Sequence, residues 1–436
     1  PIAWKESTPA AGWAPFATPA DTLVRSDWWT LLGDDTLNQL AAQVQVSNQN
    51  IAAAVASAAQ ARALVGERDA ARLPSVALSG SGQRAGGEGS SRAGNSVSAT
   101  LGANWELDVW GRLKLLADSA RASAQASEAD LAAARLSALG TLASSTLQLR
   151  AADAEAGLLR STVQGYERSL QIAQNRYAAG VAAQTDVLQA QTQLANPRAD
   201  LAGVLADRAK LEHAIAVLTG VAPGGFTLPV VDGAAWTPVV PAVPVVVPSA
   251  LLQRRPDIAA AERAVEAANA QIGIQRSAYF PQLGLSASLG QSGSAVADLF
   301  RASNSLWAVG LSLAQVVFDA GAIASQVEGA KAGHAAAVAR YRQTVLVAFQ
   351  SVEDQLTQAA TLAAQEGLRR EALAAAERTE QQMLNRYRAG QVGYTEVVAA
   401  QATALSARRA LLQLQVDRQV AAVLLVQALG GGWQAS

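Results

Sequence analysis

The sequence predicts an α+β membrane protein built from two internal repeats, each with a strand hairpin and a long helical hairpin. Three features support this fold class: duplicated segments, short stretches of alternating hydrophobicity, and long proline-free stretches of helix-forming residues. Residues 385–405 repeat residues 175–195 with nine identities in twenty-one positions, and residues 258–286 repeat residues 51–79 with eleven in twenty-nine. Because both matches follow the same order, we expect one architecture built twice.

Composition excludes several classes of protein and site. The 436 residues carry 34 basic and 35 acidic side chains, so the net charge of −1 gives no reason to expect a nucleic-acid partner. Cysteine is absent, which excludes disulfides, thiolate catalysis and zinc–cysteine sites within this sequence. The two histidines, His213 and His334, have no second ligand at metal spacing. We therefore expect no enzyme, no metal site and no cofactor.

The connection between the repeats is rich in proline. Seven of the fourteen prolines fall between Pro223 and Pro256, which predicts an extended connector over 221–256. No run of about eighteen apolar residues occurs, so a membrane-spanning helix is not expected. The chain begins at Pro1 without an initiator methionine, so we expect a processed N-terminus.

Each repeat begins with a helical stretch, over 36–73 or 257–280, and continues into two segments in which apolar residues alternate with small or polar ones. Such alternation is typical of strands, and Gly/Ser-rich links join them into hairpins at 74–108 and 281–317. The alternating segments are 76–81, 97–108, 283–290 and 307–314.

Two interpretations fit these four strands: a small sheet resting on a core, or part of a transmembrane barrel. Aromatic residues near the strand ends favour the barrel, because membrane interfaces are enriched in them. Glu106 and Asp108 also suit a water-filled lumen better than a dry core. The interfacial aromatics would be Trp105, Trp110, Tyr279, Phe280 and Trp307. Four strands cannot close on themselves, and open edges are not tolerated in lipid, so several chains must share such a barrel.

The remaining part of each repeat, 109–220 and 318–429, predicts two long helices joined at Gly180 or Gly390. The first helix of each hairpin lacks proline and is rich in Ala, Leu, Gln, Glu and Arg. In the first repeat this helix carries a heptad seam of coiled-coil type. Pro197 interrupts the returning helix of that repeat and predicts a local kink.

Short strings of residues along the whole chain carry a family resemblance. They are Trp28-Trp29, Gly33-Asp34, Leu37-Asn38-Gln39-Leu40, Leu107-Asp108, Gly111-Arg112, Arg254-Arg255-Pro256-Asp257-Ile258, Glu262, Ile272-Gly273, Phe280-Pro281, the two Arg-Tyr-x-x-Gly turns, and Leu429-Gly430-Gly431-Gly432-Trp433. In order, spacing and duplication they resemble the TolC-like outer-membrane factors (outer-membrane efflux proteins), especially the lipoprotein branch of tripartite RND-type efflux systems.

The resemblance implies a homotrimer whose twelve-stranded transmembrane β-barrel, four strands per chain, continues into a twelve-helix periplasmic α-barrel. The protein would be the outer-membrane exit duct of a Gram-negative multidrug efflux pump, passively conducting substrates from an RND-type inner-membrane transporter and a periplasmic adaptor (membrane fusion protein). Outer-membrane lipids would surround the barrel, and most of the chain would lie in the periplasm. A type I secretion channel and a coiled-coil periplasmic scaffold remain alternatives.

The resemblance also divides the chain and marks two departures. An equatorial belt would comprise residues 1–35, 221–256 and 430–436. The lipid-bearing cysteine of the lipoprotein branch is absent from this sequence. Ala322 replaces the arginine expected after Phe318-Asp319-Ala320-Gly321, which leaves open whether a capping or pairing contact is kept there.

The helical tips are the candidate functional site. In the family these tips meet the adaptor and close the duct. The adaptor-docking residues would be Gly180, Val181, Gly390 and Val392, and the residues of the gate at the periplasmic aperture would be Asp186, Glu396, Tyr387 and Arg386. Asp186 and Glu396 are equivalent in the two repeats, and a ring of carboxylates in a narrow pore attracts cations. Both also suit the first turn of a helix, where a carboxylate complements the helix dipole.

Overall fold

The computed structural model describes residues 27–86, 94–231, 236, 238–241, 243, 254–297 and 301–431. The chain forms two compact units, one of Pro1–Ala54, Leu131–Pro256 and Val345–Ser436, the other of Val55–Asp130 and Asp257–Thr344. The belt positions 1–26 and 432–436, and most of 232–253, lie outside the described residues. Among the described helices, none combines the length and apolar character needed to cross a membrane.

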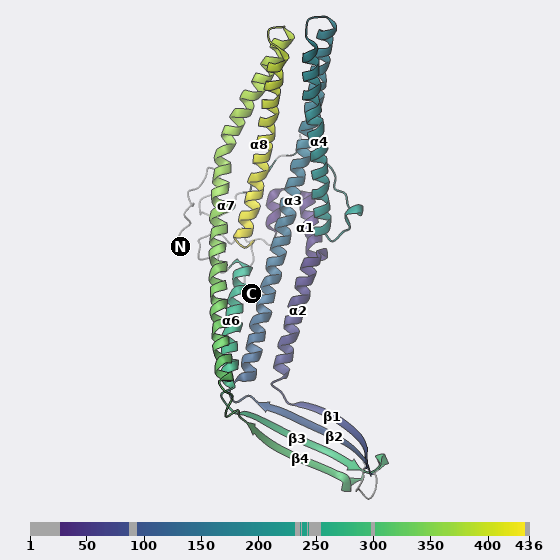
Figure 1. Ribbon diagram of the computed structural model, residues 1–436, viewed down its shortest axis with the longest axis vertical. Coiled ribbons are helices and arrows are strands. Elements are labelled where there is room, and N and C mark those ends of the chain that lie inside the picture. Colours follow the sequence, from purple (N-terminus) through teal and green to yellow (C-terminus); the bar gives the residue numbers. More distant parts are fainter. Residues whose placement is uncertain are drawn as a thin grey trace. The chain divides into compact units, whose positions relative to one another are not determined.

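Four antiparallel strands form one sheet in the order β1-β2-β3-β4 (Figure 1). The strands are β1 Ser75–Ala85, β2 Gly94–Leu107, β3 Gln282–Gly293 and β4 Ser305–Ala314, which confirms all four predicted strands. β1 and β4 are the edge strands, and every residue of both is exposed in the single chain.

The register of the sheet gathers the apolar residues on one face. Leu78 lies opposite Leu101, Leu101 opposite Leu289, and Leu289 opposite Trp307. Residues opposite one another in paired strands point to the same face, so these side chains form one apolar row across all four strands. The neighbouring row, which contains Gly102, carries a small side chain or none in every strand: Ala77, Gly102, Ser288 and Ala308.

The first helical stretch is divided into α1 Asp35–Ser47 and α2 Gln49–Ala70, a break that the sequence prediction missed. Asn48 causes it: its Oδ1 accepts the N–H groups of Asn50 and Ile51 at 3.0 Å each, which caps the start of α2. Its Nδ2 donates to the carbonyl of Leu218 at 2.8 Å. In the second repeat, α6 Pro256–Ser277 ends shortly before Pro281, as predicted.

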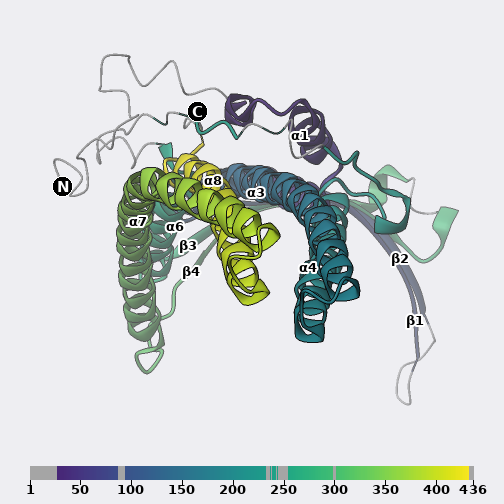
Figure 2. The same cartoon turned by 90° about the horizontal axis from the view of Figure 1, so that it is seen from above.

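Two long helices form each of the segments 109–220 and 318–429 for which a helical hairpin is predicted. They are α3 Arg112–Ala178, α4 Gln184–Leu218, α7 Ala322–Arg388 and α8 Tyr394–Ala428, and Figures 1 and 2 show α3 with α4 and α7 with α8 as two hairpins. α4 continues through the buried Pro197 without an interruption. The kink expected at Pro197 stays a prediction.

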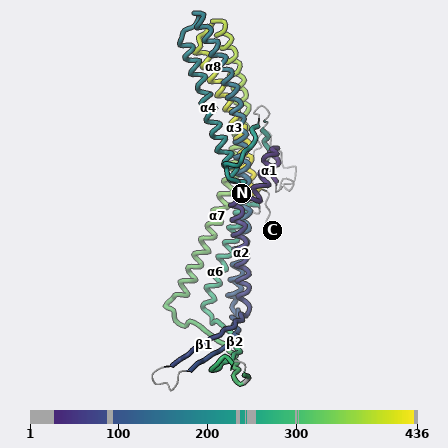
Figure 3. Tube along the Cα trace, turned by 90° about the vertical axis from the view of Figure 1, so that its right-hand side faces the viewer, coloured from purple at the N-terminus to yellow at the C-terminus, as the bar shows by residue number. Residues whose placement is uncertain are grey.

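The largest apolar cluster of the first unit joins six elements, including α2 through Ile51. It contains Trp28 and Trp29 of a short 3-10 helix η2 (Trp28–Leu32), Leu37 of α1, Leu142 of α3 and Val423 of α8, together with Ile215 of α4. α1 therefore packs beside α3 (Figure 3). Burial of these large side chains holds the start of the described chain against both helical hairpins.

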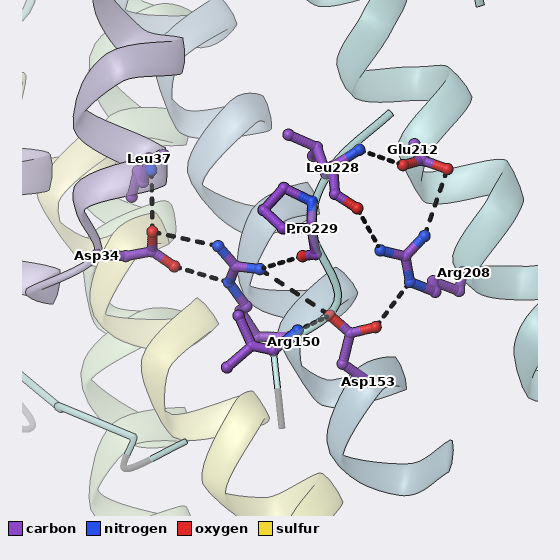
Figure 4. Close-up of polar contacts among 9 residues, drawn as sticks. Asp34, Leu37, Arg150, Asp153, Arg208, Glu212, Leu228 and Pro229 are labelled. Carbon is purple, nitrogen blue, oxygen red and sulfur yellow. Dashed lines mark hydrogen bonds and ion pairs between the residues drawn. The ribbon is translucent and has the colours of Figure 1, made fainter. Parts of the chain in front are cut away.

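A buried charged network fixes the chain around the middle of α3 (Figure 4). Arg150, 3% exposed, donates from Nε to Asp34 Oδ2 at 2.9 Å, and Asp153, 1% exposed, accepts from Arg208 Nε at 2.7 Å. Arg208 also donates to the carbonyl of Leu228 at 2.9 Å. Burial opposes ionisation of Asp34, but hydrogen bonds from Arg150 and a backbone N–H outweigh it and lower its pKa from the ordinary value. The network ties the segments around Asp34 and Leu228 to α3 and α4.

At the junctions between the sheet and the long helices, both repeats keep an aspartate that caps the helix, but only the first repeat has an arginine–glutamate ion pair. Asp108 accepts from the backbone N–H of Leu113 at 2.9 Å, and Asp319 accepts from that of Ile323 at 2.6 Å, so the cap is kept in both repeats. In repeat 1, Arg112 binds Glu106 with contacts as short as 2.6 Å. In repeat 2, Ala322 replaces this arginine, and no acidic residue occurs at 313–316, where the partner would lie. The arginine and its acidic partner are therefore missing together.

Candidate functional site at the helical tips

Both hairpins turn through the same backbone motif. Gly180 and Gly390 have φ of 73° and 74°, a left-handed conformation that residues without a Cβ adopt readily. After Gly180, the N–H of Val181 donates to the carbonyl of Arg176 at 3.0 Å, and the N–H of Gly180 donates to that of Tyr177 at 2.9 Å. The second turn repeats both bonds. This is a Schellman motif, which ends a helix and reverses the chain in few residues.

Residues of the first hairpin hold Tyr387 of the second. The Tyr387 side chain is only 2% exposed, and its hydroxyl donates to Asp186 Oδ2 at 3.3 Å. The guanidinium carbon of Arg176 lies 4.8 Å from the centre of the Tyr387 ring, a cation–π contact. Arg176 Nη1 also donates to the carbonyls of Tyr387 and Arg388, at 2.9 and 3.2 Å. Thus Asp186 and Arg176, both from hairpin 1, bind the C-terminal end of α7.

A small apolar cluster, the tip core, surrounds this contact. It contains Ala173, Ala190, Tyr387, Tyr394 and Val397, with the two tyrosine rings edge to face at 5.1 Å. Burial raises the pKa of Tyr394 to about 12. The pKa of Tyr387 is raised in the same direction by burial and by the charge of Asp186. Both hydroxyls therefore stay protonated at neutral pH.

The four gate candidates do not play equivalent parts in the single chain. Asp186 and Tyr387 are brought together by a hydrogen bond, whereas the Arg386 side chain is exposed. Arg176, the equivalent residue of the first repeat, contacts Tyr387 instead. Glu396 is exposed, and its Oε2 lies beside Gly393, 3.1 Å from where a Cβ would stand at the start of α8. The duplicated Asn-Arg-Tyr string was the available signal for Arg176, but it does not tell which arginine is used.

The two docking candidates also differ. Val181, at the tip of hairpin 1, is 63% exposed, whereas Val392, at the tip of hairpin 2, is half-buried and packs against the tip core. Gly180 and Gly390 are both exposed at the turns. A partner would therefore find a free apolar side chain on hairpin 1 in particular.

Polar contacts continue between α8 and hairpin 1 away from the tip. Thr395 Oγ1 donates to Gln189 Oε1 at 3.3 Å, and Gln401 Nε2 donates to Ser169 Oγ at 3.3 Å. Arg409 then binds both Glu155, at 2.7 Å, and Asp200, at 3.0 Å. The contact between the hairpins is therefore directional along its length and is not apolar packing alone.

The predicted interfacial aromatics lie near the two ends of the sheet. Trp105, Trp110, Tyr279 and Phe280 lie at or beside the ends of β2 and β3 next to the helices, and Trp307 lies near the opposite end, at the start of β4. Trp110 stacks on Phe280 with ring centres 4.8 Å apart. Trp307 is 78% exposed in the single chain.

Comparisons with known proteins agree with this architecture. The profile of the family described as "Outer membrane efflux protein" matches residues 40–221 and 247–431. The pyoverdine export outer membrane protein OpmQ of Pseudomonas aeruginosa is 32% identical, over 93% of this chain and 87% of OpmQ. The cation efflux system protein CusC of Escherichia coli O6:H1 is 29% identical, over 95% of this chain and 90% of CusC.

Solved structures give the same answer for the fold. The outer-membrane channel OprN superposes with a TM-score of 0.87 at 30% identity, covering 97% of this chain and 99% of OprN. A structure of CusC superposes with a TM-score of 0.85 at 27% identity. The chain therefore belongs to the outer membrane efflux protein family and is an efflux channel of the Gram-negative outer membrane, not an enzyme.

Proposed function

We propose that three copies of this chain form one duct, with a twelve-stranded barrel in the outer membrane and a helical tunnel in the periplasm. The observation that carries this proposal is the sheet: it has one apolar face and two unpaired edge strands, β1 and β4. Unpaired backbone groups are not tolerated in hydrocarbon, so the edges must pair with other copies.

The mass of the detergent-solubilised protein tests this proposal. Light scattering coupled to size exclusion should give a protein mass of three chains once the detergent contribution is subtracted. A monodisperse single chain that remains soluble without detergent would exclude the shared barrel and would favour the coiled-coil scaffold instead.

We propose further that the duct receives substrates from an RND-type inner-membrane transporter through a periplasmic adaptor. The names of its relatives support this assignment, since they are outer-membrane components of export systems. The adaptor would dock at the hairpin tips around Gly180, Val181, Gly390 and Val392. The exposed Val181 offers apolar surface for such a partner.

The gate of this duct would be the contact between Asp186, Tyr387 and Arg176, present three times in the trimer. Breaking this contact would free the tip of hairpin 2 from hairpin 1. The two tips must separate in this way if the duct opens at its periplasmic end. Glu396, equivalent to Asp186, would add charge near the aperture without taking part in this contact. Ion conductance in planar bilayers reports on the width and the charge of the aperture together.

A further inference from the structure

A contact at the corner of the sheet occurs once in each repeat. In repeat 1, Trp105 Nε1 donates to the carbonyl of Arg72 at 2.9 Å, and in repeat 2, Gln315 Nε2 donates to the carbonyl of Tyr279 at 3.2 Å. Gln315 follows Trp105 by 210 residues (315 − 105), and Tyr279 follows Arg72 by 207 (279 − 72). These are the offsets that relate the repeats in sequence, so the internal symmetry extends to individual contacts.

A second contact joins the two repeats within the chain. Trp110, just after β2, stacks on Phe280, just before β3, with ring centres 4.8 Å apart and an angle of 20° between the rings. Trp110 Nε1 also donates to the carbonyl of Pro281 at 2.7 Å. The contact exists because β2 and β3 are paired and antiparallel, which places the segment leaving β2 beside the corner that enters β3.

The residues equivalent to the two sides of this second contact lie at the two edge strands, before β1 and after β4, and are exposed in the single chain. Leu73 and Pro74, before β1, match Phe280 and Pro281 at the offset of 207. Leu73 is 66% exposed, compared with 47% for Phe280. The corner that enters β1 therefore corresponds in sequence to the corner that enters β3, but its apolar side chain is more exposed in the single chain.

The segment leaving β4 is open in the same way. Val317 and Phe318 are 96% and 87% exposed, compared with 44% for Trp110. Ala320 stands at the position equivalent to Trp110, directly before the glycine of the turn, so the bulky apolar side chain lies two residues earlier, at Phe318. Large apolar side chains this exposed, side by side, mark an interaction surface.

We propose that Val317 and Phe318 of one copy pack against Leu73 and Pro74 of the adjacent copy, as the intermolecular counterpart of the Trp110–Phe280 contact. The inference rests on the proposed trimer, in which β4 of one copy pairs with β1 of the next. Because those strands are antiparallel, the residues leaving β4 lie beside the residues entering β1. The occupant of this apolar surface is thus a second copy of the chain, and the contact closes the ring at the junction between sheet and helices.

Cysteine crosslinking tests the contact directly, because these 436 residues include no cysteine that would react with the crosslinker. The chain carrying Phe318→Cys and Leu73→Cys is treated, as the intact detergent-solubilised protein, with a short bis-maleimide and run on denaturing gels. We expect covalent trimers. The matched control carries Trp110→Cys and Phe280→Cys and should give a crosslink within one chain, seen in its peptide masses, without covalent oligomers.

The outcomes separate the contact from the trimer itself. Covalent trimers with the pair, and none with Phe318→Cys or Leu73→Cys alone, would support the contact. A mass of three chains, with the control pair crosslinked but the Phe318/Leu73 pair unlinked, would overturn the contact while leaving the trimer standing. A mass of one chain would overturn the trimer. In addition, Phe318→Ser should lower the temperature at which trimers dissociate, and an unchanged temperature would contradict the inference.

Discussion

The two helical hairpins share a contact between their own two helices but differ in what packs against them. In each, an arginine of the returning helix binds a glutamate of the outgoing helix: Arg198 with Glu167 at 2.7 Å, and Arg408 with Glu377 at 2.9 Å. Their surroundings differ, because the buried Arg150 and Asp153 of α3 correspond to Ala360 and Ala363 of α7. Duplication has thus kept the internal hairpin contacts and has changed what is packed against them.

Equivalent leucines of the two hairpins also differ in how much of their side chains is exposed. Leu346 and Leu368 of α7 are 61% and 66% exposed in the single chain, whereas Leu136 and Leu158, at the same positions of α3, are half-buried. Hairpin 1 is held by α1 and the buried charged network. Away from the tip, hairpin 2 is held through α8: Val423 joins the apolar cluster, Gln419 donates to the carbonyl of Val239 at 3.0 Å, and polar contacts join α8 to hairpin 1. We infer that hairpin 1 is the fixed support of the duct and hairpin 2 the arm that moves.

Charged substitutions at the two tips should have the largest effect. Val181→Glu places a carboxylate on the exposed apolar tip of hairpin 1 and should abolish export, measured as loss of drug resistance in cells that depend on this duct, while trimers stay intact. Val392→Glu should also abolish export, but it buries charge against the tip core and should raise conductance as well. Unchanged drug resistance in the Val181→Glu cells would argue against docking at this tip.

The support of hairpin 1 is tested by two arginines at equivalent positions. Arg208→Ala removes the nearer of the two arginines that pair with the buried Asp153, leaving Arg150 at 3.9 Å, and should cost about 3 kcal/mol, the lower end of what breaking a buried ion pair costs. Arg418→Ala, 210 residues later, removes a more exposed pair with Glu366 and should cost about 1.5 kcal/mol, the usual loss for a hydrogen bond to a charged group. Guanidinium unfolding followed by circular dichroism in detergent measures both. Equal losses would show that the two hairpins are equally supported.

The gate distinguishes the two equivalent carboxylates. Asp186→Ala removes the acceptor of the Tyr387 hydroxyl and should raise single-channel conductance, because a hydrogen bond worth about 1 kcal/mol no longer holds the tips together. Glu396→Ala is the matched control and should leave the closed state unchanged. The double substitution should also reduce cation selectivity. Wild-type conductance and ion preference in the double variant would mean that the constriction lies elsewhere.

Much of this architecture could be predicted from the sequence because it rests on local patterns. Alternation of residue type located every strand, and the absence of proline indicated that each hairpin begins with one long helix, as α3 and α7 do. The break at Asn48 was missed, because its cap depends on the Asn48 side chain and its position on a contact with Leu218, 170 residues away. Local pattern does not contain that contact.

The candidate site was only partly predictable for the same reason. Equivalence of the repeats paired Asp186 with Glu396, and the family resemblance pointed to Arg386 beside Tyr387. The fold instead places Arg176 against Tyr387 and leaves Glu396 at its own helix end. Symmetry in sequence identifies a pair of positions, but which of the two is used depends on how the hairpins pack. The buried network around Arg150 was missed entirely, since it joins charges that are distant in sequence.

The smallest effect should be a loosening of the tip at alkaline pH. Tyr394 has a pKa of about 12 in the folded chain, raised by burial above its ordinary value of 10, so the folded tip keeps a proton that a solvated tyrosine loses. Its contribution to stability is therefore complete below pH 10 and is lost as the pH rises towards 12. Conductance should be constant from pH 8 to 10 and increase above that, and Tyr394→Phe should flatten the increase because no group then ionises at this position. Conductance that stays constant to pH 12 in the wild-type protein, or the same rise in Tyr394→Phe, would show that the tyrosines of the tip core do not hold hairpin 2 in place.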